Sequence, residues 1–454
     1  MKIFHLALVL ALSITAVAED GVKTAPKADG RFKTDVLLVV AHPDDESGVS
    51  AYLAQLMDQG KKVAAVYMTH GEAGHNNMGR ERGISLGAER EMELRHALTE
   101  LGVQNVWFLD GRDTPTQDVL QSLANWHHGT CLEELVRLVR LTQPNLIITW
   151  LPGFFIGENH GDHQAAGVLA TEAFDSAGDP AVFPAQLAQP RHTNETLLEG
   201  LTPWQPQKIY FFSDASDDKP FKGKGPEYPT SAVSPTRHVP YWRVSVDVFR
   251  FHLTQYRSYI EKFEGLNDEQ LNKLAKQDGW DGPVELIFGK ANVPSSMTGD
   301  VFEGVSAAPI PFVRSTTPAP EQRAGVSMEL GGPWTFYEDF RREHGLTSIP
   351  QAAVAEIAVT TGSTLQVPLV LRNDTSQPVD LSLVLTLPEG WAPPDLSQKY
   401  RLAPGDVFPV QLEFTVPAKK SEQAQELTFR ANSGSGTAGT VTLRVQARAG
   451  GLPQ

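Results

Sequence analysis

Cysteine is almost absent from this chain: Cys131 is the single one among 454 residues. No disulfide can form within the chain, so packing must hold the fold, and any metal site must rely on nitrogen and oxygen ligands. Cys131 lies in the stretch TCLEELVRLVRL, whose apolar residues have helical spacing. We therefore expect Cys131 to be a small residue of the core and not a nucleophile.

Long apolar runs are absent beyond the N-terminus. The first residues, MKIFHLALVLALSITAVAED, combine the basic Lys2, an apolar run and the small residues Ala16 and Ala18, which is typical of a secretory signal peptide. The run is short for a membrane span, and no cysteine follows it to carry a lipid. We expect a signal peptide at residues 1–18, a spacer at residues 19–34, and an exported protein, periplasmic or extracellular, without a membrane span.

Positive charge is scarce: 39 Lys and Arg residues stand against 54 Asp and Glu residues, and the formal net charge is −15. An acidic surface is repelled by phosphate groups, which argues against nucleic acid or an anionic membrane as a partner. With 41% hydrophobic and 20% charged residues, the composition is that of a globular protein with sizeable cores, and the length indicates two or three domains. The sequence leaves the oligomeric state open.

Residues 35–305 alternate between strand-like and helix-like patterns. Continuous apolar runs, expected for strands buried on both faces, lie at residues 36–41, 63–69, 106–110 and 145–150, with a later strand at 208–213. Helical spacing of apolar residues occurs at residues 51–59, 86–101, 132–141, 164–174 and 246–263. This order predicts an α/β domain with a Rossmann-like, mostly parallel sheet and helices on both of its faces.

The remainder of the chain has a different character. Residues 306–322 are rich in proline and small residues, and we interpret residues 306–350 as a linker region. Residues 351–449 show alternating apolar and polar positions between regularly spaced turns, which predicts an all-β Ig-like sandwich. Trp391 follows a Pro-Glu-Gly turn in this part, and we expect it to be buried in the core instead of stacking on a sugar.

Imidazoles and carboxylates follow several of the predicted parallel strands. His42, Asp44, Asp45 and Glu46 come after the first strand, His70 and Glu72 after the second, Asp110 and Asp113 after the third, and His160, Asp162 and His163 after the fourth. Ligands of a doubly wound sheet bind beyond the carboxyl ends of its strands. We therefore expect these groups to converge on a divalent metal, Zn²⁺ in the first place and another divalent metal as the alternative.

A hydrolytic zinc site needs three protein ligands and one open position for water. His42 and Asp45 lie on a loop stiffened by Pro43 and can supply two ligands, and one histidine after the fourth strand can supply the third. Adjacent side chains diverge, so one of the two neighbouring aspartates is left free as a base. His160 and His163 divide in the same way: one is a ligand, and the other either supports the ligands from behind or faces the oxyanion.

These motifs resemble a known family. AHPDDE at residues 41–46 and HGDH at residues 160–163 are similar to the paired motifs of the LmbE-like (PIG-L type) N-acetylglucosaminyl deacetylase superfamily. Shorter matches lie at residues 69–71, 90–93, 108–113 and 252–255, and the resemblance spans residues 35–305. Residues 351–449 resemble Ig-like modules of glycoside-active enzymes.

The resemblance implies a zinc-dependent hydrolase that removes the N-acetyl or another N-acyl group from an amino sugar or related glycoconjugate. Asp44 resembles the general base, which takes a proton from water at the metal, and Asp45 resembles a metal ligand together with His42 and His163. His160 resembles the group that steadies the oxyanion or protonates the leaving amine, with Asp162 orienting it. Arg90 and Asp113 resemble residues that contact the sugar.

Two alternatives stand beside this interpretation. The first is an amidase for another sugar-linked amide, such as a thiol conjugate; export argues against it because such thiols are mostly cytosolic. The second is a glycan-binding protein without catalysis. Asp44 argues against that second alternative, because binding does not require a free carboxylate next to the ligands.

Overall fold

The computed structural model describes most of the chain. The predicted signal peptide at residues 1–18 and most of the predicted spacer lie outside the described residues, as does part of the predicted linker. The described ranges are residues 29–153, 160–188, 201–215, 219–314, 324–350, 354–421, 423–434 and 436–449. No helix within these ranges is long and apolar enough to cross a membrane.

A six-stranded sheet lies at the centre of the first part, in the order β3-β2-β1-β4-β5-β8. Its strands are β1 (Val36–Val40), β2 (Val63–Tyr67), β3 (Asn105–Phe108), β4 (Leu146–Trp150), β5 (Lys208–Phe212) and β8 (Ile287–Ala291). The first five run parallel, and β8 pairs antiparallel with β5. Every residue of β1 is fully buried, as its sequence VLLVV predicts. The prediction of a mixed α/β part with a mostly parallel sheet is confirmed.

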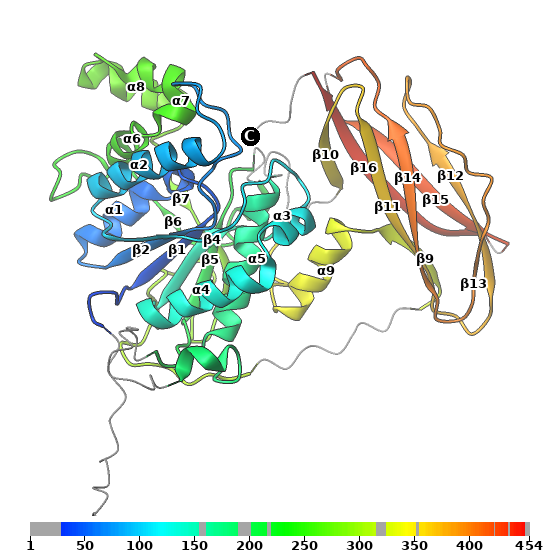
Figure 1. Ribbon diagram of the computed structural model, residues 1–454, viewed down its shortest axis with the longest axis horizontal. Coiled ribbons are helices and arrows are strands. Elements are labelled where there is room, and N and C mark those ends of the chain that lie inside the picture. The colour runs from blue at the N-terminus through cyan, green and yellow to red at the C-terminus, as the bar shows by residue number, and fades with distance from the viewer. Residues whose placement is uncertain are drawn as a thin grey trace, which may run out of the picture.

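Helices cover both faces of this sheet (Figure 1). On one side lie α1 (Ser50–Asp58), α2 (Ile84–Leu101) and α6 (Tyr241–Phe249), and on the other α3 (Val119–Asn125), α4 (His128–Thr142) and α5 (Gly161–Ser176). Two further helices, α7 (Leu253–Ile260) and α8 (Asp268–Asp278), lie beyond α6, and β6 (Glu227–Tyr228) pairs with β7 (Val284–Glu285). Cys131, on α4, is buried, which confirms its assignment to the core.

The predicted helix at residues 246–263 is interrupted. The helix α6 ends at Phe249 and α7 begins at Leu253. Between them His252 is fully buried, with its Nε2 2.6 Å from Glu46 Oε1. The break therefore has a physical reason: it turns His252 towards Glu46, which lies in the loop after β1.

The strand order reverses between β1 and β4, so the connections leave these two neighbouring strands on opposite sides. Such a switch point opens a crevice beyond the strand ends, where ligands bind in doubly wound sheets. Helix α5 follows β4 and packs closely against its end, because Gly167 faces the Trp150 carbonyl. A Cβ at Gly167 would be 2.8 Å from Pro152 N and closer still to Trp150 O.

This close approach gives a prediction for stability. Gly167→Ala is expected to lower the free energy of unfolding by about 1–3 kcal/mol, because α5 must shift away from the end of β4. Gly129→Ala is the matched control on α4, because a Cβ there meets no atom within 4 Å. Urea denaturation of both variants measures the difference. Equal stability of the two variants would contradict the assigned role of Gly167.

The C-terminal strands form two sheets that share one hydrophobic core, and we call β9–β16 the C-terminal β unit. One sheet has the order β10-β16-β15-β12-β13 and the other β14-β11-β9. The strands are β9 (Val326–Leu330), β10 (Ala355–Thr360), β11 (Thr364–Asn373), β12 (Val379–Thr386), β13 (Tyr400–Leu402), β14 (Val407–Thr415), β15 (Gln425–Ser433) and β16 (Gly436–Arg448). Trp391 is buried in this core, as predicted.

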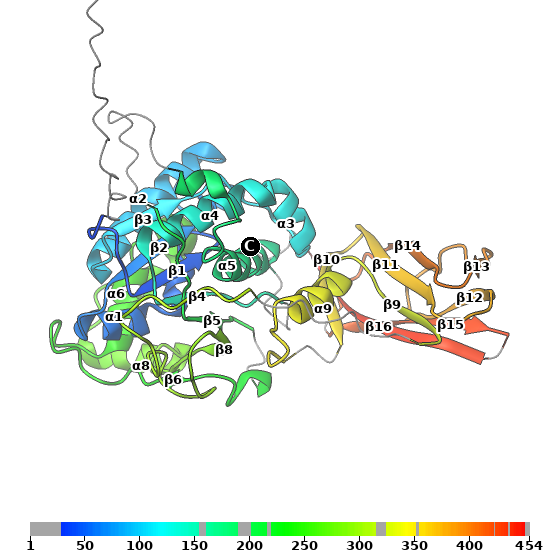
Figure 2. The same ribbon diagram turned by 90° about the horizontal axis from the view of Figure 1, so that it is seen from below.

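The segment predicted as a linker contains regular structure. Strand β9 pairs antiparallel with β11, and helix α9 (Pro333–Glu343) follows it. Figure 2 shows α9 between the α/β part and the C-terminal β unit. The residues just before α9 thus belong to a sheet of the C-terminal β unit.

Candidate functional site

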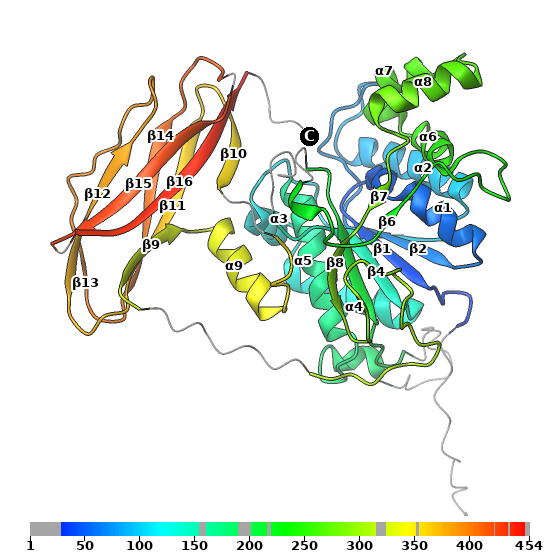
Figure 3. The same ribbon diagram turned by 180° about the vertical axis from the view of Figure 1, so that it is seen from behind.

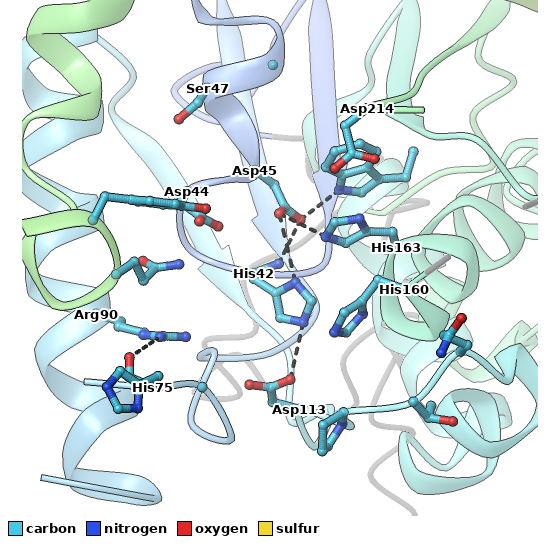
Figure 4. A pocket seen from close by; sticks show the side chains of 18 of the residues that line it. His42, Asp44, Asp45, Ser47, His75, Arg90, Asp113, His160, His163 and Asp214 are labelled. Carbon is cyan, nitrogen blue, oxygen red and sulfur yellow. Dashed lines mark hydrogen bonds and ion pairs between the residues drawn. The ribbon is translucent and has the colours of Figure 1, made fainter. Parts of the chain in front are cut away.

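A cavity of about 450 Å³ lies at the carboxyl ends of β1 and β4 (Figure 4). This volume is within the range of ~300–1,000 Å³ that is usual for small-molecule sites. The residues to which the sequence assigned a role line it, except Asp162: His42, Asp44, Asp45, Arg90, Asp113, His160 and His163. His70, Glu72 and Asp110 were also expected to converge on the metal, but they do not line the cavity. Asp162 is fully buried directly behind the cavity, and its Oδ2 lies 3.3 Å from His42 Nε2. The structure therefore brings together the strand ends that the sequence predicted to converge.

Asp45 is held in a single orientation. Its Oδ2 accepts hydrogen bonds from Ala41 N at 2.8 Å, from His42 N at 2.9 Å and from Trp150 Nε1 at 2.7 Å. Its Oδ1 faces the imidazoles, 3.3 Å from His163 Nε2 and 3.8 Å from His42 Nδ1. Although burial opposes ionisation, His163 and His42 hold the pKa of Asp45 well below its usual value.

Asp44 points in another direction, as Figure 4 shows. Its backbone has a positive φ of 115°, a conformation that an aspartate adopts at a cost. Burial and the neighbouring charge of Asp45 raise the pKa of Asp44 to about 6, against the opposing effect of His252 and of a hydrogen bond from Tyr256. The two adjacent aspartates thus differ in direction, in partners and in proton affinity.

Glu46, the third consecutive acid, does not line the cavity. It is fully buried, with Oε1 2.6 Å from His252 Nε2, and its Oε2 accepts a hydrogen bond from Tyr67 Oη at 3.0 Å. The same Oε2 accepts a bond from Asp44 N at 3.2 Å. Glu46 therefore anchors the loop and fixes the backbone from which Asp44 projects.

His160 and His163 belong to the start of α5. His160 is the N-cap residue, and its Nδ1 accepts a hydrogen bond from Asp162 N at 3.2 Å, so a neutral His160 carries its proton on Nε2. Burial and the nearby His42 and His163 lower the pKa of His160 well below its usual value. The Asp162 carboxylate contacts His42 Nε2 and Thr114 N instead, so Asp162 meets His160 through its backbone N–H.

Arg90 and Asp113, predicted to contact the sugar, both hold the loop that follows β2. The buried Arg90 guanidinium donates to Gly71 O at 2.5 Å and to His75 O at 3.0 Å. Asp113 Oδ2 accepts from Ala73 N at 2.8 Å, while its Oδ1 lies 3.3 Å from His42 Nε2. Both residues shape the wall of the cavity at the same time.

The donor groups fit a divalent cation. Ligand atoms of His42, His160 and His163 lie within 4.8 Å of one another, and so do those of His42, Asp113 and Asp162. Against the effect of burial, Asp113, Asp162 and Asp45 raise the pKa of His42 well above its usual value. A setting that favours a proton on His42 also favours a metal ion, and imidazole with carboxylate suits zinc.

Sequence reasoning did not identify several residues that line the cavity. Trp150 stacks on His163 with ring centroids 4.0 Å apart and binds Asp45 as well. The sequence feature that pointed to a role for Trp150 in the site was its position at the end of a predicted strand. Tyr256 directly follows the HLTQ match at residues 252–255. Ala358 and Arg448 belong to the C-terminal β unit, and no local pattern connects them to this cavity.

The fold and the cavity define a doubly wound α/β protein with a cluster of histidines and aspartates that could hold a metal ion. Comparisons with known proteins agree with that class. A family profile described as PIG-L: GlcNAc-PI de-N-acetylase matches residues 37–174. A 1D-myo-inositol 2-acetamido-2-deoxy-alpha-D-glucopyranoside deacetylase of Geodermatophilus obscurus is 30% identical over 213 residues, which cover 41% of this chain and 72% of that protein. The chain belongs to the PIG-L family, and the resemblance predicted for residues 35–305 is confirmed for residues 37–174.

Two further proteins are similar to parts of this chain. The enzyme of the same name from Nocardioides sp. is 32% identical over 174 residues, 33% of this chain and 57% of that protein. The chain thus spans little more than half the length of that relative. The structure of N,N'-diacetylchitobiose deacetylase from Pyrococcus horikoshii covers 56% of this chain and 83% of its own, at 22% identity and a TM-score of 0.39.

Proposed function

We propose that this protein is a metal-dependent amide hydrolase that removes the N-acetyl group from an amino-sugar derivative. The observation that carries the proposal is the contrast between Asp44 and Asp45. Asp45 is fixed by three N–H donors and faces two imidazoles, whereas Asp44 projects separately into the cavity. Membership of a de-N-acetylase family and relatives named as deacetylases support the same reaction.

His42, Asp45 and His163 would hold the metal, for which we propose Zn²⁺. When bound, such an ion acidifies water and polarises the amide carbonyl. Asp44 accepts the proton of the attacking water, because of the two adjacent aspartates it is the one that His42 and His163 do not engage. Tyr256 contacts the Asp44 carboxylate and restricts its orientation.

His160 faces the same cavity, with its Nδ1 occupied by the Asp162 backbone N–H. Its Nε2 is therefore the atom that would donate to the developing oxyanion. The lowered pKa favours this hydrogen-bonding role over that of a cationic acid. Trp150 limits movement of both His163 and Asp45, which keeps the predicted ligands in place.

Two further elements of the proposal concern the rest of the chain. We propose that the C-terminal β unit is an Ig-like module, supported by its two sheets with a common core. We also propose that the protein is exported, which rests on the sequence of residues 1–18.

Acetate release by the purified protein tests the proposed reaction. The protein is stripped with a chelator, reloaded with Zn²⁺, and assayed on a panel of N-acetylated mono- and disaccharides. We expect acetate and free amine in equal amounts from at least one saccharide, with activity that depends on the added metal. Saccharide binding without acetate release would instead support a glycan-binding protein.

A further inference from the structure

Two residues of the C-terminal β unit, Ala358 and Arg448, line the same cavity as the predicted metal ligands. They lie on the neighbouring parallel strands β10 and β16, where Thr360 is paired with Arg448. Figure 3 shows β10 on the side of the C-terminal β unit that faces α3. The wall of the cavity is therefore built by two parts of the chain that are far apart in sequence.

Gln117 joins these two parts directly. Its side-chain amide donates to Ala358 O at 2.7 Å and accepts from Ala358 N at 3.0 Å. Strand β10 is at the edge of its sheet, where backbone groups lack a neighbouring strand. Gln117 supplies the missing partner, and it does so from the segment between Asp113 and α3, at the rim of the cavity.

Helix α9 provides a second attachment. Tyr337 and Phe340 belong to the core of the α/β part, whereas Trp334 packs on the core of the C-terminal β unit. Tyr337 Oη also donates a hydrogen bond to Gln164 Oε1 on α5, the helix that carries His163. Contacts at Gln117 and at α9 together fix the C-terminal β unit beside the cavity. With two separate attachments, the C-terminal β unit cannot rotate freely about either one.

Arg448 brings a positive charge to this wall. Its guanidinium is half-buried and donates to Gln446 Oε1 through Nε at 3.3 Å and Nη2 at 2.8 Å. Within the described part of the chain, Arg448 is in no ion pair. The other cavity arginine, Arg90, is already engaged by the carbonyls of Gly71 and His75. Of the two arginines that line the cavity, Arg448 is thus the one whose guanidinium is not held by backbone carbonyls, and it retains capacity for a ligand.

We infer that the C-terminal β unit forms a second subsite of this cavity, in which Arg448 binds an oxyanion substituent of the substrate, a carboxylate or a phosphate. A guanidinium matches both groups through paired hydrogen bonds. The inference rests on the proposed function and deepens it: the substrate would be an N-acetylated amino sugar that carries a negative charge beyond the amide. Arg448 is then a specificity-determining residue, with Gln117 as the residue that positions its sheet.

Matched pairs of substrates test this subsite. N-Acetylglucosamine 6-phosphate is compared with N-acetylglucosamine, and a disaccharide of N-acetylglucosamine and glucuronic acid with N,N'-diacetylchitobiose. The wild type is expected to prefer the anionic member of at least one pair. Arg448→Ala should lower kcat/KM for that anionic substrate roughly tenfold or more, mainly by raising KM. The same substitution should change kcat/KM for the neutral substrate of the pair by less than about twofold. Arg448→Lys should retain part of the preference, and Arg430→Ala, at an exposed position of β15, should retain all of it.

Several outcomes would overturn the subsite. Equal losses on neutral and anionic substrates in Arg448→Ala would do so, and so would a wild type without preference in either pair. If the wild type releases no acetate at all, the proposed reaction fails, and calorimetric binding of the two disaccharides decides on the subsite. Tighter binding of the acidic disaccharide that disappears in Arg448→Ala supports it, whereas equal or absent binding refutes it.

Discussion

Asp44→Asn is expected to lower kcat for acetate release by about 10²–10⁴-fold, the usual contribution of a positioned general base. The amide keeps the shape of the carboxylate but does not accept the proton of the attacking water. Binding of saccharide should remain near that of the wild type, because the substituted group acts on the water. Steady-state kinetics with the metal-loaded variant measures the effect.

Tyr256→Phe is the matched variant for this experiment. It removes the hydroxyl that contacts Asp44 and leaves the carboxylate in place. The loss in kcat should therefore be much smaller than in Asp44→Asn. Comparable losses in the two variants would contradict the assignment of the proton transfer to Asp44.

His163→Ala is expected to abolish metal binding and, with it, acetate release. Loss of a group that only supports a metal ligand lowers metal affinity about 10–100-fold, and loss of a ligand should cost more. The change also removes the ring that stacks on Trp150 and the imidazole nearest to Asp45 Oδ1. Metal analysis after dialysis, with circular dichroism as a check on folding, measures the result.

His96→Ala provides the control for this change. His96 is an exposed histidine of α2 and lies outside the cavity. This variant should keep both metal and activity. A folded His163→Ala protein with full metal content would rule out His163 as a ligand.

Strand positions were predictable because a buried parallel strand leaves a continuous apolar run. Residues 36–41 and 145–150 were predicted, and β1 and β4 occupy almost the same positions. The helix expected at residues 164–174 begins earlier, at Gly161, because His160 caps it with a side-chain acceptor. His163 is consequently a residue of the first helical turn, and its rigidity could not be inferred from the motif alone.

Convergence of the site residues was predictable for a similar reason: the carboxyl ends of parallel strands share one edge of a sheet. The motif did not reveal that Glu46 is buried against His252, about two hundred residues later in the chain. Nor did it indicate that Arg90 and Asp113 hold backbone groups of one loop. These contacts depend on how distant segments pack, and no local spacing encodes them. The same holds for Ala358 and Arg448, which reach the cavity from another sheet.

The most direct test of the account compares metal content in Asp44→Asn and Asp45→Asn. The two positions are adjacent, the substitutions are identical, and only Asp45 faces His42 and His163. We expect Asp44→Asn to retain stoichiometric Zn²⁺ after dialysis while losing turnover, and Asp45→Asn to lose the metal. Equal metal content in the two variants, whether kept or lost, would contradict the division of roles between the neighbouring aspartates.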